Sequence, residues 1–193
     1  MAYIQEDKGK LNLAPKKFNM WVFLCTSFMF FAALTSAFIV YGGGKAHTLN
    51  MHLPDAFMYS TAVIILSSVT MWMSSRAAKG LQFGKQRTYL WITFLLGIAF
   101  FIIQMFAWYT MAYRMQVYFT NPNASISFVY VFSGMHLLHI LAGLVLIIIS
   151  LRGAYGKMPQ AINLYRMEMS SIFWHFVDII WIYLYVFLLL NQH

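Results

Sequence analysis

Long apolar runs separated by short polar segments dominate the pattern of this chain. Five of them are long enough to cross a bilayer: residues 18–41, 56–75, 88–113, 126–151 and 170–191. A transmembrane helix needs about 20 mostly apolar residues, whereas a strand of a membrane barrel needs only about 9–11. Because backbone groups in lipid must be satisfied within their own segment, each run is predicted to be a helix. We therefore expect an all-α polytopic membrane protein with five transmembrane helices, with residues 1–193 forming a single membrane domain.

The composition supports this assignment. Hydrophobic residues make up 61% of the 193 and charged residues only 9%, whereas about a quarter of the residues in a soluble domain are charged. The single cysteine, Cys25, lies inside the first apolar run, so it predicts neither an internal disulfide nor a paired-cysteine zinc site. That run is too long for the core of a signal peptide, and we expect it to remain in the membrane.

The basic residues predict the orientation of the bundle. With five spans, eleven of the thirteen lysines and arginines fall on one side: Lys8, Lys10, Lys16, Lys17, Arg76, Lys79, Lys85, Arg87, Arg152, Lys157 and Arg166. Lys45 and Arg114 fall on the other side. Because short loops rich in lysine and arginine stay in the cytoplasm, we expect the N-terminus inside and the C-terminus outside. The net charge of +8 is then explained as a topology signal and as contacts with anionic lipid headgroups, and it does not indicate nucleic-acid binding.

Ionisable side chains stand inside the last two apolar runs, where they are costly and commonly functional. His136 and His139 are three residues apart and share one face of a helix. In the last run His175 lies beside Asp178, and Trp174, Asp178 and Trp181 form one stripe. Asp178 and His139 lie about 12 Å and about 16 Å from the inner ends of their predicted helices. This similar depth leads to the hypothesis that Asp178 pairs with His139 or His136.

These residues alone allow three interpretations. They could form a hydrogen-bond network that holds the last two helices together, as polar groups in membrane bundles commonly do. A proton path is a second interpretation, although a single carboxylate, with no chain of others across the bilayer, makes a poor proton relay. A haem site is the third, with His136 or His139 and His175 as ligands from facing helices. A metal site would need a third or fourth ligand, and none is visible in the sequence.

Glu168 is expected at the inner N-terminus of the fifth helix. The helix dipole favours negative charge there, so a cap at the membrane interface is the first interpretation. A contact with a lipid headgroup or with another subunit is the alternative.

Several motifs resemble subunit III of the haem–copper respiratory oxidases. Glu168 is followed by Trp174-His175-Phe176-Val177-Asp178 and by Trp181, which matches the last helix of that family. Further matches are the Gly134-x-His136-x-x-His139 element with Gly143, the stretches Met20–Leu24 and Phe30–Ala32, and Leu96-Gly97 with Gln104. The likeness runs from about Lys17 to Leu190. Five spans resemble the shorter bacterial form, which lacks two leading helices of the longer one.

The resemblance implies a non-catalytic subunit III of a proton-pumping terminal oxidase of the cytochrome c oxidase type, in the bacterial cytoplasmic membrane. Such a subunit would stabilise subunit I, hold phospholipids in a cleft and support proton uptake, with subunits I and II as partners. Haem and copper would belong to the partner subunits, and oxygen would be reduced to water by the complex. Membership of a larger respiratory supercomplex is left open. The implied lipid-cleft and packing network comprises His136, His139, Glu168, Trp174, His175, Asp178 and Trp181.

Two positions depart from the family. Ser27 and Ala107 stand where the family often has buried acids, so no role of those acids is carried over. Subunit III of a quinol oxidase is the alternative within the superfamily. A small bis-histidine membrane cytochrome and a proton-coupled transporter using Asp178 are the alternatives from other classes.

Overall fold

The computed structural model describes residues 14–42, 54–114, 116, 124–156 and 159–191. Its long helices are α2 (Ala14–Gly42), α3 (Ala56–Lys79), α4 (Phe83–Tyr109), α5 (Ala124–Tyr155) and α6 (Gln160–Leu190). One π-helical turn, η1 (Thr110–Arg114), continues α4. All five long helices have the length and apolar composition needed to cross a membrane. The prediction of an all-α chain with five long apolar helices is confirmed.

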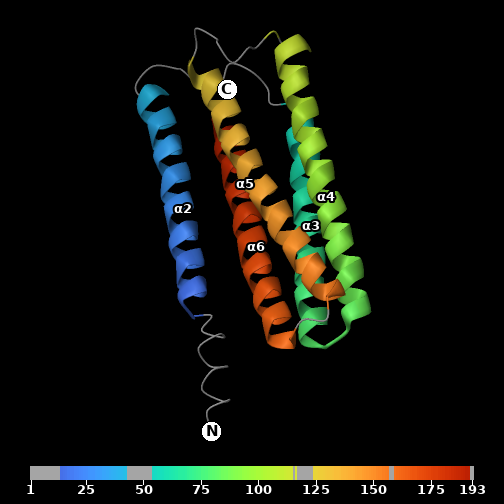
Figure 1. Ribbon diagram of the computed structural model, residues 1–193. Helices are drawn as coiled ribbons and strands as arrows, with labels where there is room; N and C mark the ends of the chain where they lie inside the picture. The colour runs from blue at the N-terminus through green and yellow to red at the C-terminus, as the bar shows by residue number, and fades with distance from the viewer. Residues whose placement is uncertain (1–13, 43–53, 115, 117–123, 157–158, 192–193) are drawn as a thin grey trace.

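The helices lie lengthwise beside one another (Figure 1), and α2 stands at one edge of the group. Among the described helices, α2 has close backbone contacts with α5 and α6 only. The other close pairs are α3 with α4, α3 with α6, α4 with α5, and α5 with α6. Helices α5 and α6 therefore each have three close neighbours, and they form the centre of the fold.

One end of the bundle carries most of the described cations. We call it the basic end: it is the lower end in Figure 1, where the N-terminal end of α2 and the α3–α4 connection lie. Its described basic residues are Lys16, Lys17, Arg76, Lys79, Lys85, Arg87, Arg152 and Arg166. Lys8, Lys10, Lys45 and Lys157 lie outside the described residues. Since α3 ends and α4 begins at this end, the described part of the sequence-based charge pattern agrees with the fold.

Helix α6 begins ten residues before the predicted start of the last span. The cause is Pro159, whose carbonyl accepts the N–H groups of Ile162 at 3.0 Å and Asn163 at 3.3 Å. The first turns are polar on one side, so hydropathy alone placed the start at residue 170. That polar side is used: Asn163 is buried and exchanges two amide hydrogen bonds, of 3.3 and 3.4 Å, with Gln86 of α4.

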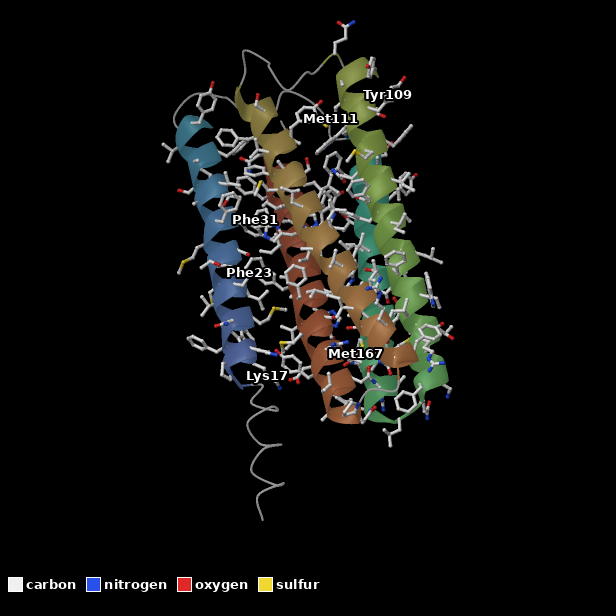
Figure 2. The ribbon with its side chains drawn as sticks, viewed as in Figure 1. Lys17, Phe23, Phe31, Tyr109, Met111 and Met167 are labelled. Carbon is white, nitrogen blue, oxygen red and sulfur yellow. The ribbon has the colours of Figure 1, made fainter. Side chains whose placement is uncertain are left out.

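Helix α2 is attached at three heights. Lys17 reaches Glu168 of α6 at the basic end, Ser27 reaches His139 of α5 near the middle, and Thr35 shares a hydrogen bond of 2.9 Å with Tyr183 of α6. Figure 2 shows the labelled Phe23 and Phe31 on the side of α2 that faces α5 and α6. Most other α2 side chains are exposed, which suits a helix with one packed side and the rest toward lipid.

Candidate functional site

Trp174 fills the space where three helices approach α6. Its side chain is fully buried. A Cβ atom placed on Gly97 of α4 would lie 2.8 Å from its ring, and one placed on Gly143 of α5 would lie 2.9 Å from it. The indole N–H donates to the Ser67 hydroxyl of α3 at 3.0 Å. Gly143 thus permits a close approach, and the group that approaches it is this indole.

Two more side chains of α6 bind hydroxyls of α3. His175 Nδ1 and the Ser68 hydroxyl are 2.7 Å apart, and Trp181 donates its indole N–H to Thr61 at 3.1 Å. We call these contacts, together with Trp174–Ser67, the α3–α6 hydroxyl seam. Hydrogen bonds between membrane helices contribute about 0.6 kcal/mol each on average, up to about 2 kcal/mol. The seam therefore fixes the position of α6 on α3 through several modest contributions.

The hydroxyls of α3 were not foreseen as site residues. A sequence signal exists for one of them, Ser67, because Ser60, Ser67 and Ser74 recur every seven residues within an apolar run. All three are fully buried in the structure. Small residues repeated on one helix face let neighbouring helices approach closely, so this spacing marks the packed face of α3.

The two histidines of α5 have different neighbours. His136 is fully buried, and its ring lies 4.8 Å from the ring of Trp181 and 5.7 Å from that of Phe100. His139 shares a hydrogen bond of 2.8 Å with the Met135 carbonyl and one of 3.3 Å with Ser27 on α2. One histidine thus meets α4 and α6, and the other meets α2.

The hypothesis that Asp178 pairs with His139 or His136 is wrong. Asp178 is buried on α6, but neither of its carboxyl oxygens has a hydrogen-bond partner among the described residues. It lies beside Ser68 of α3. The two groups are similar in depth but differ in direction around their helices, because Asp178 faces α3 whereas His139 faces α2. Gln104 and His136 likewise have no side-chain hydrogen bond within the described part of the chain.

Glu168 does not lie at a helix N-terminus, because α6 has already made two turns before it. Instead, its carboxylate forms an ion pair with Lys17 of α2, in which Lys17 Nζ lies 2.7 Å from Glu168 Oε2. Both side chains are more than two-fifths exposed, so the pair is worth at most about 1 kcal/mol. It connects α2 to α6 at the basic end, where Figure 2 labels Lys17.

Lys17→Gln is accordingly expected to lower the stability of the purified protein by less than about 1 kcal/mol. Thermal unfolding at low and high salt measures this, since salt screens an exposed pair. The loss should be present at low salt and should vanish at high salt. A loss of several kcal/mol that persists at high salt would contradict an exposed pair.

Comparison with known proteins identifies the family of this chain. The profile of the family described as Cytochrome c oxidase subunit III matches residues 11–191. The chain belongs to this family. The resemblance seen in the motifs is therefore confirmed, and it extends over nearly the whole sequence.

Individual relatives carry two kinds of name. The chain is 29% identical over 86% of its length to the cytochrome bo(3) ubiquinol oxidase subunit 3 of Pseudomonas aeruginosa, covering 79% of that protein. It is 26% identical over 93% of its length to the cytochrome c oxidase subunit 3 of Bacillus subtilis, covering 87% of that protein. This subunit III is thus similar to members from quinol-oxidising and cytochrome c-oxidising complexes alike.

In this member of the subunit III family, the motif residues of α6 are used in helix packing. Among the described residues there is no group of three or more His, Cys, Asp or Glu side chains placed to hold a metal ion. The bis-histidine alternative is not favoured by the packing, because the ring of Trp181 lies against that of His136 and His175 is bound to Ser68. Of the two departures from the family, Ser27 binds His139 and Ala107 is fully buried.

Proposed function

We propose that this chain is the non-catalytic subunit III of a proton-pumping haem–copper terminal oxidase of the cytochrome c oxidase type, in the bacterial cytoplasmic membrane. It stabilises the catalytic subunit I, has subunit II as a further partner, holds phospholipids and supports proton uptake. The complex reduces oxygen to water, and this subunit has no active site of its own. The family match over residues 11–191 supports the assignment to subunit III.

The observation that carries the non-catalytic role is the α3–α6 hydroxyl seam. Trp174, His175 and Trp181 belong to the family motif, and each is bound to a serine or threonine of α3. A side chain that holds two helices together is not free to bind a substrate. The side chains of the seam are therefore suited to holding the bundle rigid, which a scaffold for a larger catalytic subunit needs.

His175→Ala tests this role. The variant loses one hydrogen bond of the seam and is expected to shorten the active lifetime of the complex severalfold during turnover, with the initial rate nearly unchanged. Ser68→Ala removes the other partner of the same bond and should have the same effect, and the double variant should be no worse than either single one. Asp178→Asn, beside Ser68, is expected to act in the same direction. Oxygen uptake followed from the first seconds to inactivation measures both quantities.

Complete loss of initial oxygen uptake in a fully assembled His175→Ala complex would contradict a packing role. Equal haem content per complex in wild type and variant is the control for assembly.

The orientation with the N-terminus in the cytoplasm is supported by the cations at the basic end. Cys25 is exposed, so labelling is done on a Cys25→Ser background. Asp55→Cys, at the opposite end, should react with a membrane-impermeant maleimide in intact spheroplasts, and Gln82→Cys should react only after the membrane is opened. The reverse pattern would overturn the orientation.

Isolation of the tagged chain in mild detergent tests the function. We expect two larger subunits to co-purify and the isolate to consume oxygen. Reduced cytochrome c and a short-chain quinol are then offered separately. Activity with cytochrome c supports the cytochrome c oxidase type, and activity with the quinol alone would move this chain to the quinol-oxidising branch. Isolation of the chain without larger subunits or oxygen uptake would overturn the proposal.

A further inference from the structure

A groove opens at the basic end between α3 and α4, outside the α3–α6 hydroxyl seam. It has a volume of about 360 Å³. Its α3 side is formed by Trp72, Met73 and Arg76, and its α4 side by Lys85 and Tyr89. Two cations from different helices thus face one hollow.

The two cations are not neutralised within the described chain. The only ion pair among the described residues is the one between Lys17 and Glu168. Of the other described acids, Asp55 lies at the opposite end and Asp178 is buried in the bundle. The Arg76 guanidinium lies 5.6 Å from the centre of the Trp72 ring, a cation–π contact that holds it in place and leaves its N–H donors for a ligand.

The order of side chains along the groove matches that of a phospholipid. Arg76 and Lys85 are nearest the basic end, and Trp72 and Tyr89 lie one turn, about 5–6 Å, deeper on their helices. Trp72 is 55% exposed and Met73 is 36% exposed, so both are open to acyl chains. Aromatic side chains of this kind favour the headgroup level of a bilayer.

The opposite end of the same helix pair provides a comparison. A groove of about 680 Å³ there is lined by Ile102, Phe106 and the carboxylate-bearing Asp55, and no lysine or arginine among the described side chains lines it. That groove does not favour an anion. The preference for negative charge therefore comes from Arg76 and Lys85 and not from the shape of the α3–α4 pair.

We propose that the groove of Trp72, Arg76, Lys85 and Tyr89 binds the phosphate of an anionic glycerophospholipid in the membrane leaflet at the basic end. A zwitterionic lipid is disfavoured, because no acidic side chain in the described part of the chain lines the groove to pair with its cationic headgroup. Basic pockets between helices on the cytoplasmic side suit anionic headgroups. The proposal rests on the membrane placement in the proposed function.

Native mass spectrometry of the delipidated complex tests it, with phosphatidylglycerol and phosphatidylcholine titrated separately. The Arg76→Gln/Lys85→Gln double variant should bind phosphatidylglycerol about tenfold more weakly than the wild type. Lys16→Gln/Lys79→Gln removes the same charge at the same end, outside the groove, and should change binding less than about twofold. Arg76→Lys/Lys85→Arg keeps both charges and should retain binding.

Three results would overturn the proposal: unchanged phosphatidylglycerol binding in the double glutamine variant, equally tight phosphatidylcholine binding, or displacement of the lipid by millimolar inorganic phosphate, which would indicate a free-anion site. Haem content, measured on the same samples, separates this outcome from failure of the proposed function. A complex that keeps its haem while the double variant binds lipid normally refutes the lipid site alone. A chain that isolates without haem refutes the oxidase assignment, and its lipid binding is then measured on the chain in detergent.

Discussion

Trp174→Ala is expected to lower the free energy of unfolding by about 3–5 kcal/mol, the range for removing a buried tryptophan. The indole is fully buried, fits against two glycines and satisfies the Ser67 hydroxyl, so alanine leaves a cavity bounded by α3, α4 and α5. The yield of haem-containing complex and its thermal stability measure the loss. We expect little assembled complex at growth temperature.

Trp91→Ala is the matched control, because Trp91 is 44% exposed. It should cost far less than Trp174→Ala in the same assay. Equal losses for the two variants, or a stable Trp174→Ala complex, would contradict a central packing role for Trp174.

The second large effect is expected from the opposite change, the addition of one methyl group at Gly143. A Cβ there would lie 2.9 and 3.0 Å from Trp174 ring atoms and 3.3 Å from Phe173. The ring has little room to retreat, because it lies so close to Gly97 of α4 that a Cβ placed there would be only 2.8 Å from it. Gly143→Ala is therefore expected to destabilise the protein by about 1–3 kcal/mol, although alanine is the better helix former. Thermal unfolding of the purified complex measures this.

The same helix offers a control. At Gly134 an added Cβ would lie 3.6 Å from Trp108, an ordinary contact, so Gly134→Ala should be neutral or slightly stabilising. Trp174→Phe, which takes the larger ring away, should reduce the additional cost of Gly143→Ala. Simple additivity of the two substitutions would show that Gly143 and Trp174 do not meet.

The number of helices and the apolar central part of each could be predicted, because length and hydropathy determine them in lipid. The first and last residues of the helices could not be predicted, since a helix that begins with polar turns has the composition of a loop. The segment 160–169 of α6 is such a case, and its polar side chains bind neighbouring helices: Gln160 binds α3, Asn163 binds α4 and Glu168 binds α2. The same error placed Glu168 at a helix start and hid its ion pair with Lys17.

The partners of the candidate site residues could not be predicted from the sequence. One interpretation had the polar residues of the last two apolar runs hold those two helices together, but the hydrogen bonds of Trp174, His175 and Trp181 go to α3. Their partners on α3 were not predicted, because uncharged serine and threonine side chains do not stand out within an apolar run. The Asp178–histidine pairing failed because residue counting gives depth along a helix, while the direction around it depends on which helices lie next to each other.

An optical spectrum of the isolated tagged chain, taken before and after its partners are stripped away, tests the central claim most directly. A structural subunit III should show haem absorption while the larger subunits are bound and none once it is alone. A Soret band that stays with the stripped chain would make its histidines haem ligands and would contradict a purely structural role for this subunit.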